Sequence, residues 1–397
     1  MKSNRSPAND LETILPLLIN VWRRFHKQSG PGDRLQTREF RRLVGCLQQL
    51  RGEDSENKKE ANKHLPEQEN ITERERVAAN LLYPWIIHYQ EALSLLGELP
   101  GAPKRVLDVC SGTAPFAFAA LRHGASEVFA TDRNVAALEL GAEVAGRYGM
   151  PLTLRKWDCL KEAMPIEGDF DLITVGHALG DLFPINEPGW KERQSRFITY
   201  LLSRLKKTGF LLLVESSYLE DNRRILEIRD ELSLKNIVIQ APCVWQGDCP
   251  TLKTPNSPCY AQREMAKPYH LKEIQRAMGI KLSSLKMTYL LIKSPKAEKL
   301  IPNEHKLYRV ISPPSESYQG KRFYLCGTDG KKTLSSHLDE HPSESRAFEH
   351  LRRGELIEIV DPLEQGQAFD IVQGTEIIVR APCGKPVPTF ENFDDSF

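Results

Sequence analysis

Three cysteines lie close together in a stretch of the chain that is rich in proline. Cys243, Cys249 and Cys259 follow the spacing C-x5-C-x9-C, and each has a proline beside it. Thiolates bind soft metals and iron–sulfur clusters, and such clusters commonly use four cysteines. Inert buried thiols are the alternative, but an irregular Pro-rich segment is unlike a packed core. The fourth ligand has to come from the remaining cysteines, which are Cys46, Cys110, Cys159, Cys326 and Cys383.

The spacing of these cysteines bears on the type of metal. Structural zinc sites typically contain tight C-x2-C pairs, and this loop contains none. Cys249 is followed by Pro250, a dipeptide that also occurs in ferredoxin-like cluster loops. The residues therefore favour an iron–sulfur cluster, with zinc as the alternative.

A second set of residues could bind a nucleotide-like cofactor. Residues 106–115 read VLDVCSGTAP, a strand that ends in a turn of small residues and leads into a helix. Ligands of open α/β sheets bind at the carboxyl ends of the strands, where such a turn lets the backbone come close. Asp132 ends the next strand and can accept hydrogen bonds from ribose hydroxyls. Trp157 and Asp158 end the third strand, where an adenine could stack and be bound.

This pattern resembles the class I S-adenosylmethionine-dependent methyltransferases. The resemblance implies cofactor contacts by Asp108, Gly112, Asp132 and Asp158, although Cys110 and Ala114 stand where that family usually has glycines. A one-glycine turn also occurs in other nucleotide-binding folds, and Asp132 could instead cap a helix. The complete set of expected cofactor contacts is Asp108, Ser111, Gly112, Thr113, Asp132, Trp157, Asp158 and His177.

No catalytic residue is predicted. The fourth strand ends with residues 175–181, VGHALGD, where methyltransferases that act on the amino groups of bases carry an Asn/Asp-Pro-Pro-aromatic motif. A cysteine nucleophile motif for carbon methylation of pyrimidines is absent as well. His177 could contact the cofactor or act as a base, but a histidine at a strand end is at least as often structural.

The order of predicted strands and helices places these residues in an α/β domain. From residue 105, short apolar runs alternate with helical segments, which predicts a doubly wound, mostly parallel sheet. The strands expected are Arg105–Cys110, Glu127–Asp132, Leu152–Trp157, Phe170–Gly176, Gly209–Glu215, Asn236–Gln240 and Lys286–Lys293. The helices expected between them are Phe116–His123, Val135–Tyr148 and Glu192–Leu205.

Different patterns flank this framework. Residues 10–51 predict two amphipathic helices, the first capped at Asn9 or Asp10, and Arg74–Glu98 predicts a third helix that Pro84 interrupts. Residues 52–73 look like a linker, and the final dozen residues are expected to be disordered. Short strands are expected at Tyr308–Ile311, Lys321–Cys326, Lys332–Ser335, Glu355–Val360, Phe369–Val372 and Glu376–Val379, with a turn at Asp329-Gly330.

Three regions follow from these patterns. We expect an N-terminal helical region at 1–99, a Rossmann-like methyltransferase domain at 100–300 with a cysteine-rich insertion at 241–265, and a β-rich appendage with an acidic tail at 301–397.

Charge is distributed unevenly in a chain whose formal net charge is only +1. Residues 263–332 contain 15 Lys and Arg against 6 Asp and Glu, and residues 333–397 contain 5 against 13. A basic block beside an acidic tail suits nucleic acid contact that the tail regulates, although solvated faces are the plainer explanation. No run approaches the roughly 18 apolar residues of a membrane span, and no secretory signal is evident. We therefore expect a cytoplasmic protein, a monomer, without membrane contact.

Ordered motifs carry a more specific resemblance. The chain is similar to the mitochondrial small-ribosomal-subunit methyltransferase-like family, in its bacterial branch, over roughly residues 75–335. The matching motifs are Leu82-Tyr83-Pro84, residues 106–109, the three cysteines of the loop with Gln262-Arg263, residues 289–292, and residues 309–330. Cys243 is followed by Val244-Trp245, where the family usually has Pro-His.

The resemblance implies a fourth ligand and a partner. The distal cysteine of the family falls on Cys326, so the implied ligand set of a [4Fe–4S] cluster is Cys243, Cys249, Cys259 and Cys326. It also implies binding to small-subunit rRNA or a ribosome assembly intermediate, largely without methyl transfer. Two other hypotheses stay open: an active S-adenosylmethionine-dependent rRNA methyltransferase, and an RNA-binding protein that responds to iron or redox state.

Overall fold

The computed structural model describes residues 7–53, 71–297, 306–317, 320–336 and 346–387. Most of the expected linker and most of the final dozen residues lie outside these ranges. The described chain forms two compact units. Unit 1 contains residues 1–93, 107–166 and 264–285, and unit 2 contains residues 94–106, 167–263 and 286–397. The three predicted regions remain a prediction. No described helix is both long and apolar enough to cross a membrane.

The N-terminal helices are α1 (Pro7–Phe25), α2 (Thr37–Glu53), α4 (Glu73–Leu82) and α5 (Pro84–Leu96). The two helices expected in residues 10–51 and the interruption at Pro84 are confirmed. The expected cap at Asn9 or Asp10 is wrong, because α1 already begins at Pro7. Asp10 is buried instead and accepts hydrogen bonds from Tyr89 and Arg122, with its nearest Arg122 nitrogen at 2.5 Å. A buried ion pair explains this carboxylate better than a helix cap does.

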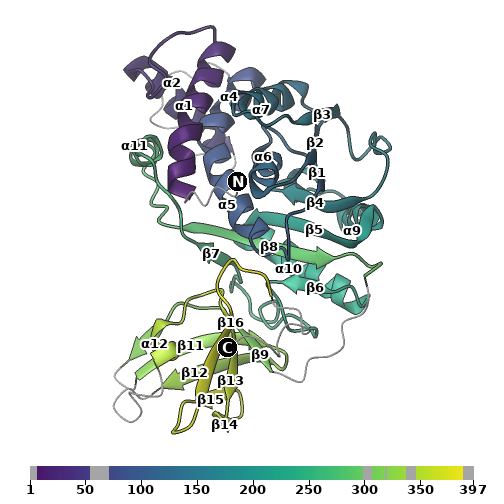
Figure 1. The fold of residues 1–397 in the computed structure, drawn as a ribbon, viewed down its shortest axis with the longest axis vertical. Helices are drawn as coiled ribbons and strands as arrows, with labels where there is room; N and C mark the ends of the chain where they lie inside the picture. Colours follow the sequence, from purple (N-terminus) through teal and green to yellow (C-terminus); the bar gives the residue numbers. More distant parts are fainter. Residues whose placement is uncertain (1–6, 54–70, 298–305, 318–319, 337–345, 388–397) are drawn as a thin grey trace. The chain divides into compact units, whose positions relative to one another are not determined.

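The α/β sheet has the strand order β3-β2-β1-β4-β5-β8-β6, with β7 paired to β8 (Figure 1). The pairs β2/β3 and β4/β5 are parallel, whereas β8 runs antiparallel to both β5 and β6. The predicted mostly parallel sheet is therefore confirmed. Its strands are β1 (Arg105–Val109), β2 (Glu127–Asp132), β3 (Thr153–Lys156), β4 (Phe170–Gly176), β5 (Leu205–Ser216), β6 (Ile239–Ala241), β7 (Ala261–Arg263) and β8 (Leu285–Lys293).

Apolar runs explain why these segments form central strands. Residues 210–215 of β5, FLLLVE, are all buried, as strands covered by helices on both faces require. Between the strands lie α6 (Pro115–His123), α7 (Val135–Arg147), α8 (Leu179–Leu182), α9 (Trp190–Ser203), α10 (Leu219–Leu234) and α11 (Tyr269–Ala277). The predicted helices correspond to α6, α7 and α9. Short α8 and β7, the long α10 and the amphipathic α11 were not predicted.

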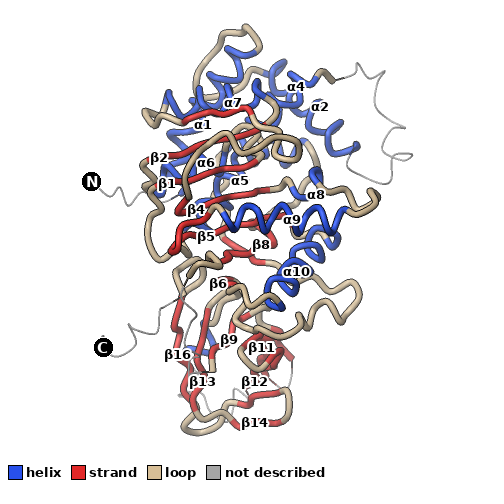
Figure 2. The backbone as a smooth tube through the Cα atoms, turned by 90° about the vertical axis from the view of Figure 1, so that its right-hand side faces the viewer, coloured by secondary structure: helices blue, strands red, loops and turns tan. Residues whose placement is uncertain are grey.

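A second sheet lies in unit 2, with the order β14-β15-β12-β11-β9-β13-β16 and β10 beside β11 (Figure 2). Its elements are β9 (Leu307–Val310), β10 (Ser315–Ser317), β11 (Gly320–Gly327), β12 (Gly330–Ser336), α12 (Arg346–His350), β13 (Leu356–Val360), β14 (Leu363–Gln365), β15 (Ala368–Asp370) and β16 (Glu376–Ala381). The six expected strands all occur. The expected turn is also confirmed, since β11 and β12 form a hairpin in which Gly327 pairs with Gly330.

Alternation within this hairpin separates two faces. Phe323, Leu325 and Leu334 point into an apolar core that also contains Phe348 of α12. On the opposite face of the hairpin, Arg322, Tyr324 and Lys331 are exposed. A strand whose side chains alternate in this way presents one face to the core and the other to solvent.

Candidate cofactor and metal sites

The turn after β1 takes a backbone path that normally favours glycine. Cys110, Gly112 and Ala114 have φ angles of 56°, 52° and 59°. For the two residues with a Cβ, this left-handed conformation costs about 1–2 kcal/mol each. The turn therefore keeps a glycine-type path although two of its positions are not glycine. Strain of this kind is typical of binding sites, where the backbone has to approach a ligand.

Close packing fixes the turn from two sides. The indole Nε1 of Trp85, on α5, donates to the carbonyl oxygen of Thr113 at 3.0 Å. Gly141, on α7, approaches so closely that an added Cβ would lie 2.6 Å from the same oxygen. Ser111 is buried, and its hydroxyl donates to the carbonyl oxygen of Asp108 at 2.8 Å. The turn is thus preorganised by its neighbours.

The two acidic residues have different surroundings. Asp108 is 1% exposed, and its Oδ2 accepts from the backbone N–H of Ala117 at 3.1 Å, at the start of α6. Asp132 is partly exposed, and its Oδ2 accepts from the N–H of Gly112 at 2.9 Å. Each carboxylate oxygen can accept more than one hydrogen bond. Asp108 therefore positions the helix, and Asp132 joins the ends of β1 and β2 with acceptor capacity left for a ligand.

The two residues after β3, Trp157 and Asp158, differ in their exposure to solvent. Trp157 is 2% exposed, and its Nε1 donates to the carbonyl oxygen of Glu162 at 3.0 Å. Its ring is covered by protein in this arrangement, whereas Asp158 is partly exposed. Asp158 accepts at Oδ1 from the N–H of Leu160 at 3.2 Å. Of this pair, Asp158 is the residue that a ligand can reach.

Cys110 and Cys159 form a thiol pair beside this turn. Their Sγ atoms lie 3.7 Å apart. The hydrogen bond between them raises the pKa of Cys110 and lowers the pKa of Cys159. Either sulfur can be the donor in this contact, and the two thiols are partners of each other. The contact accounts for two of the cysteines that the sequence left as candidates for the fourth metal ligand.

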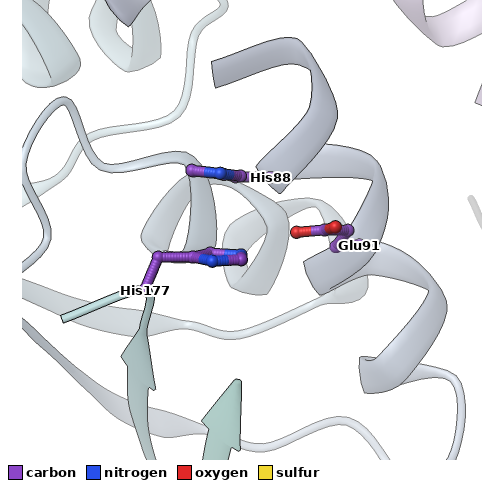
Figure 3. A group of neighbouring side chains, drawn as sticks. All are labelled: His88, Glu91 and His177. Atoms are coloured by element: carbon purple, nitrogen blue, oxygen red, sulfur yellow. The ribbon is translucent and has the colours of Figure 1, made fainter. Parts of the chain in front are cut away.

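His177 follows β4, and Figure 3 draws its side chain. Its φ angle is 53°. Its backbone N–H donates to the carbonyl oxygen of Val214 at 2.8 Å. Nearby, Glu215 accepts from the N–H groups of Ala178 and Leu179 at 3.1 and 2.7 Å. Burial raises the pKa of Glu215 to about 7, against the opposing effects of His177 and of these two hydrogen bonds. Figure 3 also draws His88 and Glu91, which both project from α5.

In unit 2, four thiols come within electrostatic reach of one another. Burial raises the pKa of Cys243, and the thiols of Cys259, Cys326 and Cys249 raise it further. The pKa of Cys326 is likewise raised, to about 12, by burial first and then by the thiols of Cys259 and Cys249. Burial also raises the pKa of Cys259, and the thiol of Cys249 raises it further. Taken together, these effects connect every pair of the four thiols.

Helix α10 positions two of these cysteines through its polar residues. Asn222 is fully buried, and its side chain donates to the carbonyl oxygen of Cys259 at 2.6 Å and accepts from the N–H of Cys259 at 3.2 Å. Further along α10, the carboxylate of Asp230 accepts from the N–H of Cys249 at 3.0 Å. Arg229, 1% exposed, donates to the carbonyl oxygens of Trp245 and Gly247 in the same loop.

Strand pairing positions the fourth cysteine. Cys326 lies in β11, opposite Lys331 of β12 and opposite Arg309 of β9. The guanidinium of Arg309 donates from Nε to the carbonyl oxygen of Pro242 at 3.1 Å, next to Cys243. Cys383 instead has its sulfur 3.9 Å from the carbonyl oxygen of Gln262.

Cationic side chains act on three of the four thiols. Arg229 lowers the pKa of Cys243 and of Cys326, and Lys331 lowers that of Cys326 and Cys259, although burial and the neighbouring thiols outweigh both. Cationic neighbours stabilise thiolates, which are the metal-binding form. Sequence reasoning missed the residues of α10 that contribute here. The available signal was an asparagine and an arginine, seven positions apart, that interrupt an otherwise apolar face of a helical pattern.

The strand order and the turn after β1 define a class of protein. If β7 is left out and β8 is counted as the seventh strand, the sheet has the order 3-2-1-4-5-7-6, and its seventh strand is antiparallel. This is the fold of the class I methyltransferases, as the sequence predicted. The chain belongs to the family described as mitochondrial small ribosomal subunit Rsm22, whose model matches residues 99–343. The predicted family is therefore confirmed. A comparison with curated proteins gave no match.

Several solved structures are similar to part of the chain. A ribosomal protein L11 methylase from Lactobacillus delbrueckii subsp. bulgaricus is 20% identical, with 51% of this chain and 76% of that chain covered and a TM-score of 0.31. The N-methyltransferase NodS from Bradyrhizobium japonicum WM9, in complex with S-adenosyl-L-homocysteine, is 13% identical, with 54% and 89% covered and a TM-score of 0.35. A precorrin-6y C5,15-methyltransferase from Geobacter metallireducens GS-15 is 17% identical, with 52% and 86% covered and a TM-score of 0.33.

Proposed function

We propose that this protein binds small-subunit rRNA during ribosome assembly, on a methyltransferase fold that carries S-adenosylmethionine and a [4Fe–4S] cluster. The observation that carries the proposal is the convergence of Cys243, Cys249, Cys259 and Cys326, which come from two separate parts of the sequence. A cluster bound to them would join the cysteine loop to the second sheet. Its chemical contribution in this account is to stabilise that arrangement.

The four sulfurs fit a cluster better than they fit a single zinc ion. Four sulfurs around zinc lie about 3.8 Å apart, because each Zn–S bond is about 2.3 Å. No three of these sulfurs, all of which lie in the described part of the chain, are within 4.8 Å of one another. A cubane cluster keeps its cysteine sulfurs further apart than one ion does. Arg229 and Lys331 would offset the negative charge of a thiolate-bound cluster.

The outer face of the β11–β12 hairpin supports RNA as the partner. Tyr324 is 39% exposed, and the ammonium of Lys331 lies 5.1 Å from the centre of its ring. Arg322 is exposed on the same face. Single-stranded RNA is commonly bound by exposed aromatic rings that stack with bases, flanked by cations that contact phosphates. We therefore assign this face, Arg322, Tyr324 and Lys331, as the RNA-binding face.

Not all of the basic block is free for such contacts. Lys321 is buried and pairs with Glu349 at 2.8 Å, and Lys306 pairs with Glu364 at 3.4 Å. Both partners belong to the acidic part of the sequence. These ion pairs explain part of the uneven charge as internal structure, and they leave Arg322 and Lys331 as the exposed cations of the hairpin.

Retention of small-subunit rRNA tests this proposal directly. Neutralised phosphates release counterions, so binding should weaken steeply as salt rises from about 50 to 200 mM. Purified full-length protein should therefore retain rRNA at low salt and lose it at high salt. Failure to retain rRNA at low salt would refute the RNA-binding function.

Binding of S-adenosylmethionine is supported by the preorganised turn and by Asp132. The left-handed residues of the turn expose backbone near Gly112, and Asp132 has acceptor capacity for ribose hydroxyls. When bound, the cofactor supplies a methyl group that a polar acceptor could take. Asp108, Ser111 and Thr113 are buried or nearly so and would act by shaping the turn. Asp158 would contact the adenine side of the cofactor.

The second candidate function is that of an active rRNA methyltransferase. The hydrogen bond between Gly112 and Asp132 favours this candidate, because the bond preorganises the proposed cofactor site. Transfer of a labelled methyl group to rRNA from a deletion strain would support this candidate. Undetectable binding of S-adenosylmethionine in a calorimetric titration would exclude it.

A redox- or iron-responsive RNA-binding protein is the third candidate. The observation in its favour is that Cys326 pairs with Lys331 and shares the outward side of β11 with Tyr324. Loss of a cluster would therefore loosen residues of the proposed RNA-binding face. Equal RNA affinity of cluster-loaded and cluster-free protein would exclude this candidate.

A further inference from the structure

A small cavity of about 40 Å³ lies in unit 2, among residues of β7, β8 and β9 and of the turn before β13. Three arginines line it, Arg263, Arg309 and Arg353, together with neutral residues and no carboxylate. Roughly three water-sized groups fit into a space of this volume. A cavity with three guanidinium groups and no acidic side chain is electrostatically suited to an anion.

Each of the three arginines has an N–H group aimed at no acceptor. The Nε of Arg263, the Nη2 of Arg309 and the Nε of Arg353 have no hydrogen-bond partner within the described chain. Arg263 and Arg309 are 8% and 5% exposed. Buried donors in proteins are nearly always paired, with protein, water or a ligand. These three donors therefore indicate a missing acceptor.

The charges at the cavity are also incompletely balanced. Arg263 forms an ion pair with Glu98 at 2.5 Å. Arg309 has no such partner among the described residues, and its guanidinium donates to the backbone oxygens of Pro242 and Gly354. Arg353 lies 4.0 Å over the ring of Tyr260. A buried cation without a counter-charge is costly, so Arg309 needs an anion nearby.

The cavity adjoins the four thiols, but only two of them line it. Cys243 and Cys259 line it, whereas Cys249 and Cys326 do not. Three further lining residues, Tyr260, Ile311 and Arg353, are only half-buried.

We propose that this three-arginine cavity binds a phosphate group. Guanidinium groups match the oxygens of phosphate with strong, charge-assisted hydrogen bonds, and three unpartnered N–H groups can serve three oxygens at once. The phosphate comes either from the RNA backbone, in which case the inference rests on the proposed RNA-binding function, or from free inorganic phosphate. Bound beside Cys243 and Cys259, it would sense the state of the metal site.

Inorganic phosphate alone is the first probe. Phosphate should raise the melting temperature of the full-length, metal-loaded protein beyond the effect of chloride at equal ionic strength, because it binds the folded state only. Arg353→Gln should weaken phosphate binding at least about tenfold in a calorimetric titration. Arg352→Gln, which removes the same charge from the exposed neighbouring residue, should leave it unchanged. Equal effects of phosphate and chloride on the wild type would overturn the proposal.

RNA is the second probe, and it separates the two sources of phosphate. If the RNA backbone supplies the group, phosphate should compete with RNA more strongly than chloride does, and Arg353→Gln should lower RNA affinity about tenfold. If free phosphate is the ligand, RNA affinity should be unchanged while the thermal shift persists. A wild type that binds phosphate but retains no RNA refutes the proposed function and leaves the cavity proposal standing. Loss of the phosphate shift in Arg309→Gln, with an unchanged circular dichroism spectrum, supports it further.

Discussion

The side chain of Asn222 bonds both backbone groups of Cys259, with donor–acceptor distances of 2.6 Å to its oxygen and 3.2 Å to its nitrogen. The same amide nitrogen also donates to the hydroxyl of Thr288 on β8, at 2.8 Å. One fully buried side chain therefore ties the cysteine loop to α10 and to the α/β sheet. The amide therefore helps to fix the position of Cys259, one of the proposed metal ligands.

Asn222→Ala should destabilise the protein by about 3 kcal/mol and weaken metal retention. It leaves the buried backbone groups of Cys259 unsatisfied, each at a cost of about 1–3 kcal/mol. Urea unfolding at equal metal loading measures the first effect, and iron content after gel filtration measures the second. Asn222→Asp keeps the acceptor for the Cys259 N–H but loses both donated hydrogen bonds, so its loss of stability should be similar or larger. Unchanged stability in both variants would contradict the assigned role.

Asp132→Asn should lower the affinity for S-adenosylmethionine at least about tenfold, because hydrogen bonds to a charged acceptor contribute about 1.5–3 kcal/mol. Calorimetry or equilibrium dialysis measures the change. Glu139→Gln makes the same charge change at an exposed position on α7 and serves as the control. If both variants bind the cofactor like the wild type, Asp132 does not contact it.

Glu215→Gln should flatten the pH dependence of stability between about pH 4.5 and 7. Burial raises the pKa of Glu215 to about 7, so in this window the folded state binds more protons than the unfolded state. The free energy of unfolding therefore falls as pH rises through the window, by up to about 3 kcal/mol from this group. Denaturant unfolding at several pH values measures the slope. Glu220→Gln, at an exposed position of α10, should keep the wild-type slope. An unchanged slope in Glu215→Gln would show that the raised pKa of Glu215 does not cause the pH dependence.

Tyr324→Ala should lower RNA affinity about tenfold, since stacking of one base on an aromatic ring contributes about 1–3 kcal/mol. Lys331→Gln should instead reduce the slope of log affinity against log salt by about one phosphate contact. Filter binding across a salt series distinguishes the two effects. Lys191→Gln, at an exposed position of α9 in the same unit, is the control for net charge. If all three variants bind like the wild type, the RNA-binding face lies elsewhere.

Local sequence patterns predicted the framework well. Alternating apolar runs predicted the sheet, and the Asp329-Gly330 turn predicted the hairpin, because both signals act over a few residues. The surroundings of the cysteines could not be predicted in this way. Asn222, Arg229 and Asp230 reach them from a helix that precedes the loop, and only packing determines which polar groups face it. The pairing of Cys110 with Cys159 likewise joins two turns 49 positions apart.

Metal and sulfide analysis after anaerobic purification tests the central claim most directly. The wild type should contain about four irons and four sulfides per chain, as a [4Fe–4S] cluster requires, with a matching absorption spectrum. Cys326→Ser should lose most of this iron. Cys383→Ser should keep it, because Cys383 has its sulfur against the oxygen of Gln262 and apart from the four proposed ligands. A wild type with one zinc and no sulfide, or equal iron loss in both variants, would contradict the account.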